Sequence, residues 1–202
     1  LGRMDRVGLS PDMITYTAII SGCAKKGDTA RAAHLLNVAL DATLKPDLVC
    51  YNAIIDSCAK RGDTAQAAHW LSQISEAFLH PNEVSYNAVI KSCGRAGDAI
   101  GARFWLDAMS ARSLQPDLIS WTSMLAACAS ARTRRSADAE GCFRQMIRSC
   151  LAPDGVVLAT LERAVGPRRR TELCAELGVA ASSVRKRGTA PHKMRSAVIE
   201  KP

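Results

Sequence analysis

PDLVCYNAIIDSCAKRGD, at residues 46–63, is one copy of a segment that recurs along this chain of 202 residues. The copies open with Pro-Asp or Pro-Asn at Pro11, Pro46, Pro81 and Pro116, so that successive copies start 35 residues apart. A Cys recurs at one position of every copy, and Gly-Asp recurs at another position of the first three. A fixed period of this length predicts a repeat array rather than a single globular core.

Each copy has the pattern of two helices joined by a short turn. In the first copy Tyr16, Ile20 and Cys23 belong to an apolar stripe at helical spacing, which predicts a helix with one buried face. Gly27 can adopt the left-handed conformation that ends a helix, and Asp28 follows where a carboxylate would cap the next one. The sequence therefore predicts an all-α fold of helix-turn-helix hairpins.

A hairpin of 35 residues with Tyr-Asn or Tyr-Thr near its start, Gly-Asp between its helices and Pro-Asp at its end resembles the pentatricopeptide repeat of the P type. The tetratricopeptide repeat, of about 34 residues, has a different signature of Trp, Leu, Gly and Tyr. The resemblance covers residues 11–154 and implies a right-handed α-solenoid. Since the chain begins at Leu1 and shows no targeting segment, we expect the C-terminal portion of an organellar member, from a mitochondrion or a plastid.

The expected organisation is a tail of a preceding repeat at 1–10, four units at 11–45, 46–80, 81–115 and 116–152, a degenerate capping repeat at 153–187 and a basic tail at 188–202. The fourth unit carries a two-residue insertion and has Arg132-Thr133-Arg134-Arg135 in place of Gly-Asp. Residues 171–185 also resemble a helix-turn-helix faintly. A helix that covers the last apolar face of the array is the favoured interpretation.

Charge and cysteine usage limit the classes of function. Of the formal net charge of +8, residues 163–202 contribute +7, from ten Lys or Arg against three Glu. This basic end could bind phosphates or be a solvated terminus. The eight cysteines include no Cys-x-x-Cys pair, so we expect buried thiols, no metal and no cofactor. The sequence lacks the His-x-Glu and Pro-Cys-x-x-Cys of a zinc deaminase, and we expect no enzymatic activity. No run approaches the ~18 apolar residues of a spanning helix.

The resemblance implies that each unit binds one base of single-stranded RNA. When positions are counted from the residue after Pro-Asp or Pro-Asn, the second position packs against the base. The fifth position acts with the last one, which is the Asp or Asn of the next Pro-Asp or Pro-Asn, to recognise the edge of the base. The expected base-stacking residues are Ile14, Val49, Val84 and Ile119. The expected base-reading pairs are Thr17 with Asp47, Asn52 with Asn82, Asn87 with Asp117, and Thr122 with Asp154.

Donor and acceptor chemistry gives each pair an expected base. Guanine and uracil present a ring N–H that a carboxylate accepts, whereas adenine and cytosine present a lone pair that needs an amide donor. Asp47, Asp117 and Asp154 therefore predict G or U, and Asn82 predicts A or C. The family pattern adds that Thr at the fifth position goes with purines and Asn with pyrimidines. In the family's parallel orientation the units predict 5′-G-C-U-G-3′.

A row of cations recurs near the end of the first helix, at Lys25, Lys60 and Arg95. Such a row could follow successive phosphates. A cation in the last turn of a helix is also favoured by the helix dipole alone. Ser130 interrupts the row in the fourth unit.

Two functions follow from these observations. The first is sequence-specific binding of single-stranded RNA in transcript processing, stability or translation. The second is a structural subunit of a large organellar assembly, such as a mitochondrial ribosome or a membrane energy-converting complex, that uses the solenoid for protein contacts. Four units distinguish only about one sequence in a few hundred, which requires further repeats or favours the scaffold.

Overall fold

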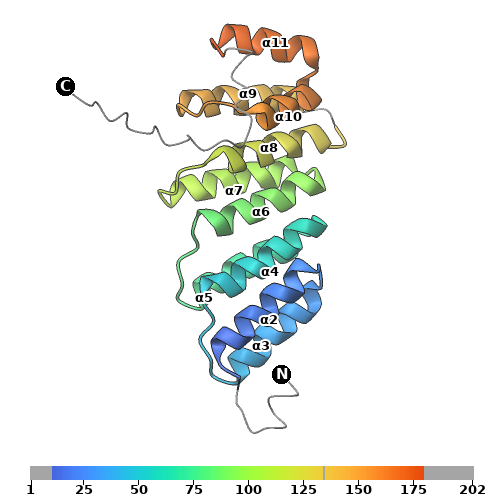
Figure 1. Cartoon of the computed structure of the whole chain (residues 1–202). Coiled ribbons are helices and arrows are strands. Elements are labelled where there is room, and N and C mark those ends of the chain that lie inside the picture. Colours follow the sequence, from blue (N-terminus) through green and yellow to red (C-terminus); the bar gives the residue numbers. More distant parts are fainter. Residues whose placement is uncertain (1–10, 134, 180–202) are drawn as a thin grey trace, which may run out of the picture.

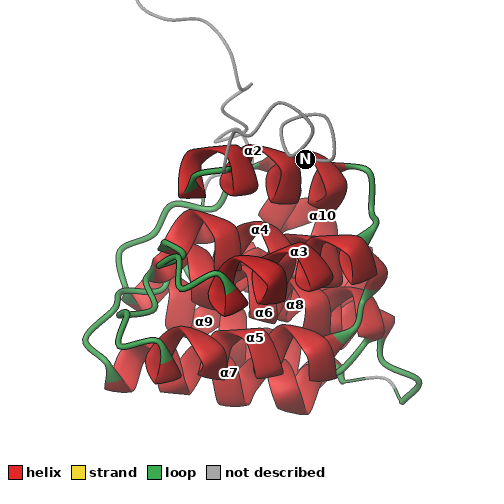
Figure 2. Ribbon diagram, turned by 90° about the horizontal axis from the view of Figure 1, so that it is seen from below, coloured by secondary structure: helices red, strands yellow, loops and turns green. Residues whose placement is uncertain are grey.

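The computed structural model describes residues 11–133 and 135–179, and within these ranges helices are the only regular elements (Figure 2). The helices are α2 (Met13–Lys25), α3 (Thr29–Asp41), α4 (Leu48–Arg61), α5 (Thr64–Glu76), α6 (Glu83–Ala96), α7 (Ala99–Ala111), α8 (Leu118–Ser130), α9 (Ser136–Arg148), α10 (Gly155–Val165) and α11 (Pro167–Glu176). The expected segments 1–10 and 188–202, and the capping repeat from residue 180 onward, lie outside the described residues.

Successive hairpins stack along one axis, from α2 and α3 at one end to α11 at the other (Figure 1). The first helices α2, α4, α6, α8 and α10 each contact the next first helix and form one layer. The second helices α3, α5, α7 and α9 each pack against the first helix of their own hairpin and of the next. This arrangement confirms the predicted all-α solenoid.

The turn between the two helices of a unit forms as the sequence predicts. Gly97 ends α6 with a φ of 70°, and a Cβ at this residue would lie 2.6 Å from the Ser130 carbonyl oxygen. Both the left-handed backbone and the close approach of the next hairpin therefore require glycine. Asp98 then caps α7 by accepting a hydrogen bond of 2.8 Å from the Gly101 N–H. Gly62 with Asp63 repeats this arrangement one unit earlier.

The core is a continuous line of side chains shared between neighbouring hairpins. Within a unit the Tyr of the first helix lies against the Trp of the second, with ring centroids 6.4 Å apart for both Tyr51–Trp70 and Tyr86–Trp105. Ala32, Ala67 and Ala102 are fully buried where the helices approach closely. The Trp121 indole N–H, in the fourth unit, is buried without a hydrogen-bond partner among the described residues, and nothing in the structure explains it.

The expected burial of the recurring thiols holds for three of the four. Cys58, Cys93 and Cys128 are buried, and burial raises the pKa of Cys58 and of Cys93 to about 11. The expectation was wrong for Cys23, which is partly exposed. Its helix α2 is the first described helix, so no described hairpin covers its outer side. Cys150, outside the recurring positions, is exposed.

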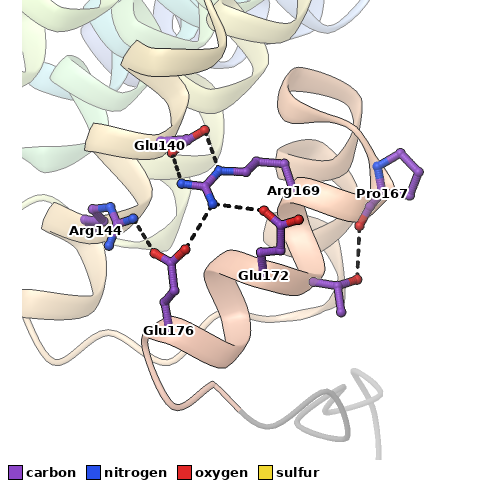
Figure 3. A network of polar contacts seen from close by, with 7 residues as sticks. Glu140, Arg144, Pro167, Arg169, Glu172 and Glu176 are labelled. Carbon is purple, nitrogen blue, oxygen red and sulfur yellow. Dashed lines mark hydrogen bonds and ion pairs between the residues drawn. The ribbon is translucent and has the colours of Figure 1, made fainter.

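The last helix, α11, is held to α9 by a network of ion pairs (Figure 3). The Arg169 guanidinium donates to both carboxylate oxygens of Glu140, at 2.9 and 2.7 Å, and reaches Glu172 and Glu176 at 3.0 and 2.9 Å. Arg144 pairs with Glu176 from the α9 side. Leu173 and Cys174 of the same helix are buried. In its described part the C-terminal segment therefore packs on the array as a terminal helix.

Among the described residues, no helix has both the length and the hydropathy needed to cross a lipid bilayer.

Candidate RNA interface

The expected base-stacking residues form an exposed apolar row in the first turn of successive first helices. Their exposed fractions are 78% for Ile14, 57% for Val49, 59% for Val84 and 51% for Ile119. Most large apolar side chains of the first helices are buried, so this row is available to pack against a flat apolar ligand. Val156 extends the row onto α10 with 54% of its side chain exposed.

Sequence reasoning missed Val156, although the signal was present. It follows Pro153-Asp154 at the same spacing at which Val49 follows Pro46-Asp47. Its inclusion gives the fourth unit an apolar side chain on both sides, from Ile119 on α8 and from Val156 on α10.

The last residue of each unit is the N-cap of the next first helix. One side-chain oxygen accepts hydrogen bonds from backbone N–H groups, as in Asp47 Oδ1 with Cys50 N at 3.1 Å and Asn82 Oδ1 with Ser85 N at 3.2 Å. Asp117 and Asp154 do the same, each toward two N–H groups. The cap therefore fixes Oδ1, and the second atom, Oδ2 in Asp or Nδ2 in Asn, remains for another partner.

The second base-reading pair is joined by a serine of the following helix. The Ser85 hydroxyl accepts from the Asn82 backbone N–H at 3.3 Å and lies 2.7 Å from Asn52 Oδ1 and 3.1 Å from Asn82 Oδ1. Because its own lone pair receives the N–H, its hydrogen is directed to the Asn oxygens. Both amide nitrogens are therefore turned away from Ser85.

The third pair repeats this arrangement and adds a direct contact. The Ser120 hydroxyl donates to Asn87 Oδ1 at 2.5 Å, and Asn87 Nδ2 donates to Asp117 Oδ1 at 3.2 Å. Asn87 is 8% exposed and is the most covered of the predicted base-reading residues. Asp117 Oδ2 remains the acceptor available at this unit boundary.

The first and fourth pairs are held differently, because their fifth residue is Thr. The Thr17 hydroxyl donates to the Met13 carbonyl of its own helix at 2.8 Å and lies 3.0 Å from Cys50 Sγ, whose backbone N–H binds Asp47. Thr122 likewise donates to the Leu118 carbonyl of its own helix. The structure shows no hydrogen bond between Thr122 and Asp154. Three of the four predicted pairs are thus linked through protein contacts, and the fourth is not.

The three predicted phosphate-binding cations lie in the last turns of their helices, as expected. Two of them have protein partners. The Lys60 ammonium lies 3.0 Å from Asp56, and Arg95 donates to the Lys60 carbonyl oxygen at 2.5 Å. Burial alone would raise the pKa of Asp56, but the hydrogen bonds from Lys60 and Lys91 outweigh it, and the pKa is lowered. Asp56 is therefore a fixed anion within this part of the cationic row.

The described residues hold no group of three or more His, Cys, Asp or Glu side chains that could bind a metal ion.

Comparisons with known proteins identify relatives of this chain. Three family models match: a pentatricopeptide repeat domain over residues 1–61, a PPR repeat family over 46–95 and a PPR repeat over 84–114, which together span more than half of the chain. A comparison with curated proteins finds no significant match.

Several solved structures share the fold. The pentatricopeptide repeat protein PPR10 in complex with an 18-nt psaJ RNA element matches with a TM-score of 0.73 at 22% identity, over 84% of this chain and 24% of that one. PPR10 from maize matches at 0.69 and 23% identity, over 88% and 26%. The PPR domain of Arabidopsis thaliana protein-only RNase P 1, in complex with tRNA, matches at 0.65 and 20% identity, over 79% and 83%. The chain spans about a quarter of PPR10. As the three family models show, it belongs to the pentatricopeptide repeat family.

Proposed function

We propose that this chain binds single-stranded RNA at the N-terminal ends of α2, α4, α6, α8 and α10, one base per unit, and catalyses no reaction on it. The observation that carries the proposal is the repeated pairing of an exposed β-branched side chain with an N-cap whose second polar atom is uncommitted. Flat apolar surfaces sandwich a base, and the free atom hydrogen-bonds to its edge. The complexes of PPR10 with an RNA element and of the RNase P 1 domain with tRNA support RNA as the ligand.

The cap geometry supports the expected base at each unit. Asn82 retains Nδ2, a donor, which suits the ring lone pair of cytosine. Asp47, Asp117 and Asp154 retain Oδ2, an acceptor, which suits the ring N–H of guanine or uracil. The proposed preference is for 5′-G-C-U-G-3′. The proposed role of the chain is in the processing, stability or translation of transcripts in a mitochondrion or plastid.

A titration with two RNAs of equal composition tests this proposal. One RNA embeds 5′-G-C-U-G-3′ between adenosine flanks, and the other embeds 5′-U-G-G-C-3′, in which every base differs from the expected one. The chain should bind the first RNA more tightly at one fixed salt concentration. Equal affinities would contradict base recognition, and no binding to either RNA would contradict RNA binding altogether.

Exposed apolar residues on the second helices favour a protein scaffold as the second candidate. Ile100 and Phe104 lie one turn apart on α7 and are 66% and 61% exposed. Such a pair can contact a partner protein. Cross-linking from α7 to a protein neighbour in the native assembly, without RNA binding in the titration above, would favour the scaffold.

A further inference from the structure

The fourth unit lacks the recurring cation, and the structure shows what replaces it. Ser130 occupies the position of Lys60 and Arg95, and Ala126 lies one turn before it on α8. These small side chains, together with Gly94 on α6, line a groove of about 360 Å³ between α6, α8 and α10. The Gly94 backbone comes so close to α8 that a Cβ would lie 2.8 Å from the Ser123 carbonyl oxygen. The groove is therefore shallow at one point and bounded by packed helices.

Cations from both neighbouring helices border this groove. Lys91 and Arg95 lie on the α6 side and Arg163 lies on the α10 side, and no lining residue is acidic. Arg163 has a Thr160 hydroxyl at 3.5 Å and no carboxylate partner among the described residues. Lys91 shares Asp56 with Lys60, each at 3.0 Å, so that two ammonium groups balance one carboxylate. The groove thus carries a net positive charge and fits an anion.

The position of the groove indicates which kind of anion it binds. Thr122 and Val156, the base-reading and stacking residues of the fourth unit, lie on its lining. An RNA whose fourth base occupied that place would have its sugar-phosphate chain beside these residues. We propose that this groove binds the backbone phosphate beside the fourth base through Lys91, Arg95 and Arg163, independently of sequence. This inference rests on the proposed function and extends it to Lys91 and Arg163, which do not belong to the recurring row.

Removing two of the cations tests the site without disturbing its floor. In the double variant Lys91→Gln/Arg163→Gln, Asp56 keeps Lys60 as a partner, so we expect the fold to be retained. Arg31 on α3 and Arg148 on α9 are exposed and lie on second helices, and Arg31→Gln/Arg148→Gln removes the same charge away from the groove. RNA affinity is measured for wild type and both variants over a range of salt concentrations.

The logarithm of the affinity for a single strand falls linearly with the logarithm of the salt concentration, and each lost phosphate contact makes this slope less steep by roughly 0.7. At 0.1 M salt, one lost contact corresponds to a loss of affinity of about fivefold. We expect the groove variant to lose about one phosphate contact and to bind both test RNAs more weakly by the same factor. The control variant should keep the wild-type slope. Equal slopes for the two variants would overturn the groove as a phosphate site.

A neutral linkage locates the contact. A methylphosphonate on either side of the fourth base should weaken binding to wild type more than binding to the groove variant, which keeps only Arg95 of the three cations. The same linkage beside the first base should weaken both proteins alike. If the linkage at the fourth base weakens wild type and the groove variant by the same factor, the assignment is overturned.

The outcomes for the groove and for base recognition are separable. If wild type shows base preference and the groove variant keeps the wild-type salt slope, the groove is not a phosphate site and the proposed function stands. If the groove variant has a reduced salt slope and wild type shows no base preference, the groove is supported as a phosphate site and recognition of one base per unit is contradicted. No RNA binding by wild type would overturn both.

Discussion

At the scale of single residues, the caps determine which atom each unit presents. An N-cap side chain has two polar atoms, and one of them is already bound to the start of the next helix. The helix that the cap stabilises therefore also orients the recognition group, because Oδ1 is fixed by the backbone N–H and the second atom lies opposite. Substitutions that keep the cap but change the second atom separate recognition from folding.

Asn82→Asp is such a substitution. It keeps Oδ1 as the cap of α6 and replaces the Nδ2 donor with an acceptor, so the base preferred at the second position should change from cytosine to uracil. The expected size is about 1–3 kcal/mol, the cost of leaving a buried polar group unpaired. Titrations of 5′-G-C-U-G-3′ and 5′-G-U-U-G-3′ against both proteins at one salt concentration measure it. A variant that binds both RNAs equally would contradict the assignment.

Ser120→Ala removes the hydroxyl that holds the Asn87 amide. Without the hydrogen bond from Ser120 Oγ, Asn87 Oδ1 is buried and unpaired. The free energy of unfolding should therefore fall by about 1–3 kcal/mol, measured by denaturant titration. The preference for uracil over guanine at the third position should also weaken, since the amide is then held only by its hydrogen bond to Asp117 Oδ1.

Ser92→Ala is the matched control, because Ser92 is equally buried but its hydroxyl binds only the Val89 carbonyl of its own helix. It should leave base preference unchanged. If the two variants behave alike in binding, Ser120 has no role in orienting Asn87.

The role of Ser85 and Ser120 could not be predicted from the sequence, although their partners were identified. Each serine contacts a residue 33 positions earlier, across a unit boundary. A local pattern shows that Ser85 follows a capping residue, but only the stacking of hairpins brings it to Asn52. Val156, by contrast, repeated a visible motif and was predictable.

At the scale of helices, the periodic pattern predicted α2 to α8 well because each begins at a capping residue and the Gly-Asp turns separate the two helices of a hairpin. The α8–α9 connection was harder, since the Arg-rich insertion has no capping residue: Arg135 precedes α9, and its side chain pairs with the Asp138 carboxylate instead of accepting a hydrogen bond from a backbone N–H of α9. The cationic groove was also missed. It arises from small residues on α8, and small side chains alone do not indicate a site.

The docking of α11 should depend on pH. Hydrogen bonding by Arg169 lowers the pKa of Glu140, and hydrogen bonding by Arg144 lowers the pKa of Glu176. A carboxyl whose pKa is lower in the folded state stabilises it above the ordinary value, about 4.3, and this contribution is lost as the pH falls through the lowered pKa. Amide exchange in α11, corrected for the intrinsic rate, should therefore accelerate below about pH 4.3.

Arg169→Gln checks the source of that dependence. It should expose α11 to exchange already at pH 7 and flatten its pH profile, because Glu140, Glu172 and Glu176 lose their shared partner. Arg168→Gln, at an exposed neighbour, should behave as wild type. An unchanged profile in Arg169→Gln would mean that Arg169 is not the source of the pH dependence, and it would leave the Arg144–Glu176 ion pair as that source.

At the scale of the whole molecule, stability is shared between neighbouring hairpins rather than stored in one core. Thiol accessibility should report this distribution. Cys50, Cys58 and Cys93 have a pKa raised to about 11 by burial, so at pH 8 they should react with an alkylating reagent only when a hairpin opens. Exposed Cys150 should react first.

Mass spectrometry of the native protein orders these rates. Fast labelling of Cys58 or Cys93 would contradict the packed array.

A chelator should leave the melting temperature unchanged, and a large loss of stability with a chelator would contradict the expectation that no metal is bound.

A ligand that spans several hairpins should stabilise the array as a unit. A ligand at a concentration of 100 times its Kd stabilises the native state by about 2.7 kcal/mol. If α2 to α10 bind consecutive bases, 5′-G-C-U-G-3′ should raise the melting temperature more than 5′-G-U-C-G-3′, which exchanges only the two middle bases. The swapped RNA mismatches Asn82 and Asp117 together while its charge and composition are identical, so any difference reports the order of the units along the solenoid. Equal shifts would mean that the chain binds RNA through its cations without recognising bases, and the absence of any shift would favour a protein partner for the exposed row.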